Sequence, residues 1–304
     1  MFKQVILICT IFTLGLCIQL LRLWPSKNLE LVFCDVGQGD AILIKYGFWQ
    51  MLIDTGPNDQ VLECLRQNMS FWDKTLEVIL ITHTDADHIG GFASVLSNYQ
   101  TNDIFLADTG TSTSYKNMLN ELLAEKFRYT QIKTAFLGQM IAFSPGGQLL
   151  FLGPDEGQLP PINASANKFS ETLLSDVTLL ESKNNDDPNE RSIILLLKYI
   201  DFEFLLMGDA SSKNELALVK RGLIEKVEGI KVGHHGSNTS THVDLIEQSQ
   251  PEIAVISCGY NNKFGHPSLD VIKILNQNQV KILRTDELGT IKLITDGTAY
   301  WIVD

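Results

Sequence analysis

The stretch Val78–Gly91 reads VILITHTDADHIGG. It begins as an apolar run typical of a buried strand and then changes abruptly in character. Four side chains that can bind metal follow within six residues: His83, Asp85, Asp87 and His88. Aspartate and histidine are also common in solvated turns, which is the alternative interpretation. The second interpretation is a metal site, because α/β proteins place their sites at the carboxyl ends of buried strands. The rest of the chain decides between a solvated turn and a metal site.

The composition is that of a folded, acidic protein. The chain has 304 residues, of which 44% are hydrophobic, and this is ample for a packed core. Lys and Arg number 24 against 36 Asp and Glu, so the formal net charge is −12. Proteins that coat themselves non-specifically in nucleic acid are usually basic, so any such contact here must be local or helped by a partner. The cysteines form no CxxC pair and indicate no disulfide framework.

Residues 1–26 differ from the rest of the chain. Lys3 precedes an apolar run from Val5 to Leu21, and Trp24 follows where an interfacial anchor would lie. We expect this segment to be a membrane anchor or a signal segment, with a buried N-terminal helix as the alternative. The remainder is therefore expected to be membrane-anchored or exported, outside the cytoplasm.

Residues 29–304 read as one domain of alternating strands and helices, which is the α/β class. Helices are predicted over residues 58–68, Ile89–Tyr99 and about 113–127, and further helices follow Ser211 and Ser268. Residues 155–191 are rich in Pro, Asn, Ser and Asp and are predicted to be a surface loop.

Histidine is concentrated at strand ends. Five of the six histidines fall in three glycine-flanked clusters, THTDADHIGG, VGHHGSNTS and GHPS. Two further strands end in LIDTG, with Asp54, and LLMGD, with Asp209. Ligands delivered by several strand ends are what a composite metal site requires. The sequence therefore predicts a metal site at one edge of the sheets.

The residue types indicate roles within this site. Asp87 and His88 would point differently from His83 and Asp85, so the turn could serve one or two ions. Asp209 suits a bridging role because a carboxylate has two oxygens. Adjacent residues at a strand end face opposite ways, so one of the neighbouring histidines is expected to bind metal and the other to touch substrate. The sequence does not distinguish them, and both stay candidates: His234 and His235.

A second group of residues is expected around the metal or at the substrate. Asp54 is expected to orient a ligand, and His266 to contact substrate or donate a proton. The others are expected to fix the edge of the site or to hold phosphate, with ordinary turn or surface roles as the alternative: Asp35, Asp40, Lys231, Ser237, Ser240 and Thr241.

Taken in order, these motifs resemble the metallo-β-lactamase fold superfamily. The resemblance covers Leu29–Asp304 and implies a four-layer αβ/βα sandwich with a hydrolytic metal site along one edge. FCDVGQGDAILI, IKVGHHGSNTS, CGYNNKFGHPS and RTDELGTI together resemble the C-terminal domain of ComEC-type competence proteins. Those are DNA-uptake channel proteins, and this domain is proposed to degrade one DNA strand.

Two departures from the superfamily pattern change the expected metal. The usual loop is HxHxDH, and Asp85 stands where the middle histidine would be. The third motif usually carries a histidine, whereas this chain has DPNERS there. The resemblance then leaves His83, Asp85 and Asp209 at the first metal position. An oxygen-rich site favours Mn²⁺ or weakly held Zn²⁺.

The resulting prediction is a metal-dependent hydrolase, a phosphodiesterase or nuclease acting on DNA, with Asp87 and His266 as its catalytic residues. DNA, a membrane and a separate DNA channel protein are the expected partners. The alternatives are a small-molecule phosphodiesterase or esterase of the same fold and a non-catalytic anchored module.

Overall fold

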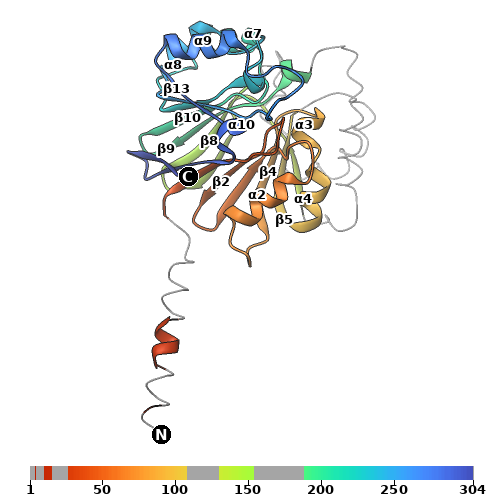
Figure 1. Ribbon diagram of the computed structural model, residues 1–304, viewed down its shortest axis with the longest axis vertical. Coiled ribbons are helices and arrows are strands. Elements are labelled where there is room, and N and C mark those ends of the chain that lie inside the picture. Colours follow the sequence, from red (N-terminus) through yellow and green to blue (C-terminus); the bar gives the residue numbers. More distant parts are fainter. Residues whose placement is uncertain (1–3, 5–9, 16–26, 108–129, 154–187, 304) are drawn as a thin grey trace, which may run out of the picture.

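The structure, a computed structural model, describes residues 4, 10–15, 27–107, 130–153 and 188–303. Two β-sheets face one another in this part of the chain (Figure 1). The first has eight strands, in the order β15 (Tyr300–Val303), β14 (Ile291–Thr295), β1 (Leu29–Phe33), β2 (Ile42–Tyr46), β3 (Trp49–Ile53), β4 (Thr75–Ile81), β5 (Gln100–Leu106) and β6 (Gln131–Thr134). The second has seven, in the order β13 (Lys281–Arg284), β12 (Ile253–Ile256), β11 (Gly229–Lys231), β10 (Phe202–Leu206), β9 (Ile194–Tyr199), β8 (Gly147–Gly153) and β7 (Met140–Ser144).

Helices cover the outer face of each sheet. The first sheet carries α2 (Gln60–Asn68), α3 (Ala86–Ile89) and α4 (Phe92–Asn98). The second carries α7 (Ser212–Lys220), α8 (Val243–Ser249) and α9 (Leu269–Gln277), while α10 (Thr285–Leu288) follows β13. Short 3-10 turns occupy η2 (Pro188–Arg191) and η3 (Gly233–Gly236).

Three apolar layers hold the elements together. One lies between the sheets and includes Phe33, Phe151 and Phe204, all nearly inaccessible to solvent. The others lie beneath the helices of each sheet. Successive residues of a strand face opposite sides of its sheet, one toward the layer between the sheets and the next toward the layer beneath the helices. Both faces of these strands are therefore apolar. The predicted αβ/βα sandwich is confirmed.

Strand direction sets the position of the site. β3, β4 and β5 run parallel in the first sheet, and β10 to β13 run parallel in the second. Parallel neighbours end at the same edge. The residues that follow β3, β4, β10 and β11 therefore meet at one end of the sandwich.

The helix predicted for Ile89–Tyr99 is wrong in its boundaries. Two short helices, α3 and α4, replace it, and they are separated by Gly90 and Gly91. A Cβ on Gly90 would lie 2.1 Å from the carbonyl oxygen of Pro57, and one on Gly91 would lie 2.3 Å from that of Thr55. The glycines allow this turn to pack directly on the backbone after β3. The short helix α8 was not predicted.

The expectation of no disulfide is also wrong, because Cys34 and Cys64 are bonded although they are 30 residues apart. Strand β1 and helix α2 bring them together, and spacing in the sequence carries no sign of this contact.

Some predicted segments lie outside the described residues. These are the helix at 113–127, nearly all of the loop at 155–191 and most of the N-terminal segment. Within the described ranges, no helix is both long and apolar enough to cross a membrane.

Candidate metal centre

Four strands deliver the central residues of the site. Asp54 follows β3, His83 and His88 follow β4, Asp209 follows β10, and His235 lies in η3 after β11. Each of these residues is at most 2% exposed. Asp54 and His235 have positive φ angles of 57° and 54°, conformations that are uncommon outside glycine. The chain therefore buries unusually polar and partly strained residues at one point, as functional sites often do.

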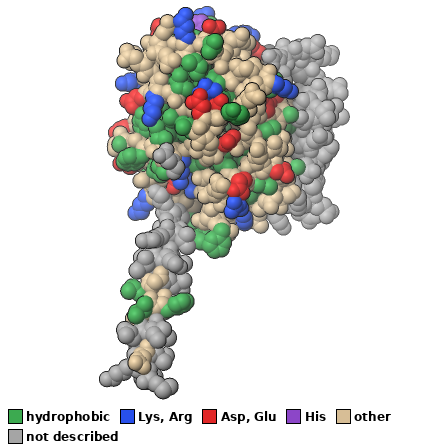
Figure 2. All heavy atoms as spheres, viewed as in Figure 1, with side chains coloured by type: hydrophobic (Ala, Val, Ile, Leu, Met, Phe, Trp, Pro, Cys, Tyr) green, Lys and Arg blue, Asp and Glu red, His purple; other side chains and the backbone are tan. Residues whose placement is uncertain are grey.

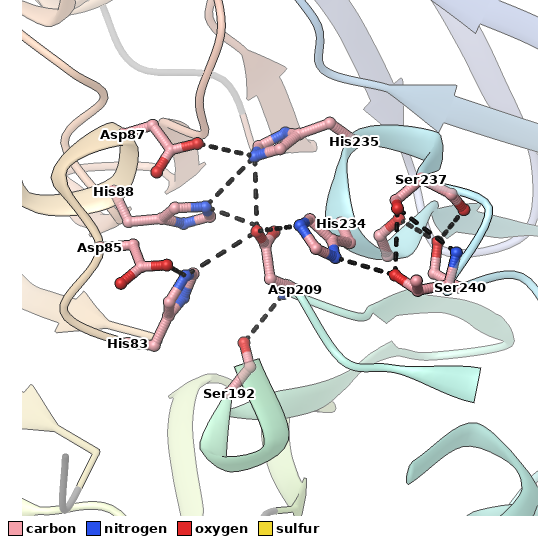
Figure 3. Close-up of polar contacts among 12 residues, drawn as sticks. His83, Asp85, Asp87, His88, Ser192, Asp209, His234, His235, Ser237 and Ser240 are labelled. Carbon is pink, nitrogen blue, oxygen red and sulfur yellow. Dashed lines mark hydrogen bonds and ion pairs between the residues drawn. The ribbon is translucent and has the colours of Figure 1, made fainter. Parts of the chain in front are cut away.

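Asp209 is the centre of the cluster (Figure 3). Its Oδ1 lies 3.3 Å from Nε2 of His88. Its Oδ2 lies 3.8 Å from Nε2 of His83, 3.5 Å from Nε2 of His235 and 3.9 Å from Nε2 of His234. Four imidazole nitrogens thus face one carboxylate, which is the position expected for a bridging ligand.

The two aspartates of the THTDADH loop lie on different sides of this cluster. Asp87 Oδ2 lies 3.3 Å from Nε2 of His235, and Asp85 Oδ2 lies 3.8 Å from Nε2 of His83. Asp87 is about one-third exposed, and Asp85 is more exposed still, at 41%. Asp85 is therefore a peripheral candidate ligand, whereas Asp87 borders both the buried cluster and solvent.

Overlapping groups of ligand atoms are close enough to share an ion. Of the four such groups among the described residues, one is His83, His88 and Asp209, and a second is Asp87, His88 and His235, each with its atoms within 4.8 Å of one another; the remaining two include Asp40. This arrangement accommodates one ion or two neighbouring ions. His83 and Asp87 fall in different groups, but His88 belongs to both and Asp85 to neither, so the predicted division of the loop into two pairs is not observed.

Hydrogen bonds behind the histidines fix which nitrogen faces the centre. His88 Nδ1 lies 2.7 Å from Oδ2 of Asp54, and His235 Nδ1 lies 2.9 Å from the carbonyl oxygen of Ser257. A ring that donates from Nδ1 presents a lone pair at Nε2. The two Nε2 atoms then face each other across 3.3 Å, which requires a proton or a cation between them.

The residues present fit a divalent cation. His83 Nε2 is buried and has no hydrogen-bond partner among the described residues. It faces Asp209, and its unused lone pair would be satisfied by a metal. Imidazole and carboxylate ligands together suit Zn²⁺ and Mn²⁺.

The electrostatics of the site point the same way. Burial lowers the pKa of His88 and His235, but the carboxylates of Asp209, Asp54 and Asp40 outweigh burial and raise both above the ordinary value. Burial raises the pKa of Asp87, yet its hydrogen bond with His235 and the nearby His88 lower it to about 2. A concentration of carboxylate charge that draws protons onto imidazoles also attracts a cation.

His83 differs from its neighbours. Burial, together with the adjacent His88, lowers the pKa of His83 well below its ordinary value. Its ring is therefore neutral at physiological pH and available as a ligand without losing a proton.

A buried ion pair lies behind His235. Lys231 Nζ hydrogen-bonds Asp40 Oδ2, and both side chains are at most 1% exposed. Asp40 Oδ1 lies 3.6 Å from Nδ1 of His235. Lys231 therefore supports the wall of the site, and the structure does not place it where a phosphate would bind.

The hydroxyls after η3 are used within their own loop. Ser240 Oγ donates to the carbonyl oxygen of Gly233 at 2.7 Å, and Ser237 Oγ lies 3.0 Å from Oγ1 of Thr239. Thr239 in turn lies 3.3 Å from Nδ1 of His234. Ser237 and Ser240 hold the loop that carries the histidines.

Two other predicted residues lie further out. Asp35 is exposed, and its carboxylate accepts a hydrogen bond from the Gly37 backbone within its own turn. His266 contacts His234, with ring centroids 5.8 Å apart, and is half-buried at the rim. The structure thus brings His266 next to the cluster and leaves Asp35 outside it.

The most informative comparison is with protein families. Residues 34–260 match the model described as "Metallo-beta-lactamase superfamily". The chain belongs to the metallo-β-lactamase superfamily. Among solved structures, it is similar to the metallo-β-lactamase fold protein YhfI from Bacillus subtilis, with 10% identity and a TM-score of 0.53, over 90% of this chain and all of that one.

This superfamily member is also similar to curated competence proteins. ComE operon protein 3 of Bacillus subtilis is 26% identical over 90% of this chain, and competence protein ComA of Neisseria gonorrhoeae is 24% identical over 88%. The chain spans 34% and 32% of their lengths, about a third in each case.

Sequence reasoning missed two residues of this metallo-β-lactamase site. Ser192, in the segment without the third-motif histidine, accepts a hydrogen bond at 2.9 Å from the backbone N–H of Asp209. Glu215 is buried in α7 and accepts bonds from the backbone N–H groups of Thr241 and His242. The position of Ser192 in the third motif was a usable signal, but an ordinary helical glutamate such as Glu215 gave none.

Proposed function

We propose that this chain is a metal-dependent phosphodiesterase that hydrolyses DNA. The observation that carries the proposal is the convergence of four imidazole nitrogens on Asp209, with Asp87 on the solvent side of the cluster. Fold alone does not determine the reaction, so the donor set and its surroundings carry the argument.

The residues have distinct roles in this proposal. His83, His88, Asp87, Asp209 and His235 would hold the metal, with Asp85 at the edge. When bound, a divalent cation supplies a water of lowered pKa and positive charge against the phosphoryl oxygens. Mn²⁺ should serve at least as well as Zn²⁺ because much of the donor set is carboxylate.

The chain's own groups complete the reaction. Asp87 stays ionised, with its pKa near 2, and so can orient the attacking water by accepting a hydrogen bond. His266 lies at the rim beside His234, where it can donate a proton to the leaving oxygen. Burial lowers the pKa of His266, which makes the protonated ring a stronger acid but leaves a smaller fraction of it protonated at neutral pH.

A surface loop next to His266 supports a nucleic acid substrate. Tyr260 is 86% exposed and Phe264 is 56% exposed. The Phe264 ring stacks on His266 with centroids 5.7 Å apart, and Lys263 Nζ lies 5.0 Å from the same ring. Exposed aromatic rings beside a cation bind the bases and phosphates of a single strand. The similarity to competence proteins also favours DNA.

The proposed location is outside the cytoplasm, with the N-terminal apolar segment as an anchor. The Cys34–Cys64 disulfide supports it because such bonds persist in oxidising compartments. A DNA channel protein is the proposed partner, because the matched relatives are named as competence proteins.

A small phosphodiester is the second candidate substrate, favoured by the net charge of −12, which repels a polyanion.

The test of both candidates is to incubate the purified 304-residue chain with single-stranded DNA and, in parallel, with bis-p-nitrophenyl phosphate, each with Mn²⁺ or Zn²⁺. We expect DNA cleavage that chelation abolishes and Mn²⁺ restores. Activity that survives exhaustive chelation would overturn the metal mechanism. Cleavage of the small ester alone would replace DNA as the substrate, and no cleavage of either would favour a binding module.

A further inference from the structure

Three large apolar side chains are exposed at the end of the domain opposite the metal site. Phe71 is 77% exposed, Phe48 is 53% exposed and Trp72 is 45% exposed. The rings of Phe71 and Trp72 contact each other edge to face, with centroids 4.7 Å apart. We call Phe48, Phe71 and Trp72 the distal patch.

The strands determine where this patch lies. Phe48 is in the turn between β2 and β3, and Phe71 and Trp72 precede β4. Gln50 joins the two segments, since its side-chain amide donates to Asp73 at 2.8 Å and to the backbone of Thr75 at 3.3 Å. The connection between α2 and β4 is at the lower end of the domain in Figure 1, and Figure 2 shows hydrophobic side chains exposed there.

The metal site lies at the other end of the same strands. Asp54 and His83 follow the carboxyl ends of β3 and β4, whereas the patch precedes their first residues. β4 has seven residues, and at about 3.3 Å per residue it spans roughly 20 Å. A surface that covers the patch therefore leaves the metal site open.

The chain enters the domain at the patch end. Leu29, the first residue of β1, pairs with Tyr46, the last residue of β2, and so lies one strand from the turn that carries Phe48. The tyrosine hydroxyl of Tyr199 donates to the carbonyl oxygen of Lys27 and holds the chain just before β1. The apolar run Val5–Leu21 lies only a few residues before this point.

Several charged side chains at this end are paired. Lys45 and Lys292 both pair with Glu30, and Asp73 accepts hydrogen bonds from Gln50 and the backbone of Thr75. Lys74 Nζ lies 4.8 Å from the centroid of the Tyr99 ring. An aromatic surface whose neighbouring charges are paired in this way suits the interfacial region of a bilayer, where Trp and other aromatic residues are enriched.

We propose that the distal patch inserts into the interfacial region of a lipid bilayer, so that the metal site faces away from the membrane. The inference rests on the proposed N-terminal anchor and is independent of the hydrolytic reaction. Phe48, Phe71 and Trp72 act with the anchor, which holds them at the surface, and they fix the orientation of the domain. Neutral phosphatidylcholine is sufficient as the lipid.

The test uses the full chain in phosphatidylcholine vesicles whose acyl chains carry bromine, which quenches tryptophan at close range. The parent protein and Trp72→Phe are compared, because their difference isolates Trp72 from the other three tryptophans. We expect a quenched emission component in the parent that Trp72→Phe lacks. Equal quenching in the two proteins would overturn the inference.

A second comparison tests the patch as a unit. Phe48→Ser/Phe71→Ser should reduce the quenching of Trp72 at least twofold, because the neighbours that carry it into the interface are lost. The matched control is Tyr260→Ser/Leu288→Ser, which removes two exposed apolar side chains, 86% and 58% exposed, that follow β12 and β13 at the metal-site end. The control should leave the quenching unchanged, and equal losses in both variants would contradict an oriented domain.

Flotation separates this inference from the proposed anchor. Protein that fails to float with vesicles would contradict the anchor and the patch together. Protein that floats with Trp72 unquenched would retain the anchor and overturn the patch, leaving a protein partner as the occupant.

Discussion

His88 Nδ1 lies 2.7 Å from Oδ2 of Asp54, and both side chains are fully buried. Asp54 also accepts hydrogen bonds from the backbone N–H and the hydroxyl of Thr82, each at 2.7 Å. These three contacts hold the carboxylate in place, and the carboxylate in turn points Nε2 of His88 at Asp209. Asp54 therefore decides the orientation of the His88 ring. Its side-chain hydrogen bonds are to Thr82 and His88, which both follow β4 of the same sheet.

Asp54→Asn should weaken metal binding by about 10- to 100-fold, the usual effect of removing a partner behind a ligating histidine. Asparagine keeps an oxygen for Thr82, but its amide cannot accept a proton from His88. Titration of the metal-free protein with Mn²⁺ measures the change. Asp270→Asn, on the exposed side of α9, is the control and should bind as the parent does. An unchanged affinity in Asp54→Asn would show that Thr82 and packing orient the ring without Asp54.

Asp87→Ala should lower turnover of single-stranded DNA by at least about 10²- to 10⁴-fold, since it removes a ligand and the acceptor that orients water. The expectation rests on the 3.3 Å contact with His235 and on the position of Asp87 between the cluster and solvent. The melting temperature of the metal-free Asp87→Ala variant should lie within a few degrees of that of the metal-free parent, because the substitution leaves the three apolar layers unchanged. Parent-like turnover in Asp87→Ala would mean that the loop is a polar turn and not an active site.

Asp85→His should shift the metal preference toward Zn²⁺, because imidazole replaces a hard oxygen donor 3.8 Å from His83. The ratio of the Mn²⁺ and Zn²⁺ dissociation constants is the measurement, with Asp85→Asn as the variant that keeps an oxygen donor. A ratio that neither variant changes would exclude Asp85 as a ligand.

Metal binding should strengthen as the pH rises. The carboxylates around His88 and His235 overcome the effect of burial and raise the pKa of both rings, so the metal-free site holds its protons to a higher pH than free imidazoles would. A metal must displace those protons, and its apparent affinity therefore increases until the raised pKa values are passed. Calorimetric titrations with Mn²⁺ from about pH 6 to about pH 9, in buffers of different ionisation enthalpy, measure both affinity and proton release. Affinity that is flat with pH and releases no protons would contradict this account.

Glu215 should make the fold less stable as the pH rises. Burial raises its pKa from 4.5 to about 7, against the two backbone N–H groups that lower it. The folded chain then binds a proton that the unfolded chain releases, so the stabilisation is complete below about pH 4.5 and is lost as the pH passes 7. The loss amounts to about 3 kcal/mol.

Melting temperatures at about pH 5.5 and about pH 8 test this for the parent and Glu215→Gln. The parent should lose more stability across this interval than the variant, which has no proton to release. His88 and His235 are present in both proteins, so their titration cancels in the comparison. Parallel profiles would show that Glu215 is ionised throughout, held by Thr241 and His242.

The sequence by itself determined the α/β class and the edge at which the polar residues meet, and the resemblance of its motifs to a known family implied the sandwich. Apolar strands that end in Asp54, His83, Asp209 and His235 bring those side chains to one edge whenever the strands run parallel, and strand direction follows from the intervening helices. Local pattern is sufficient for the strands and for the polar residues at their ends, because side-chain alternation and turn residues act over a few positions.

Only the tertiary structure decided which neighbours meet across long separations. Cys34 finds Cys64, and Lys231 finds Asp40 from 191 residues away. The left-handed backbone at His234 and His235, with φ angles of 47° and 54°, puts His235 in the buried cluster and leaves His234 nearer the rim. These pairings and the burial of His235 depend on how one sheet packs against the other. The spacing of residues within a single segment carries no information about that packing.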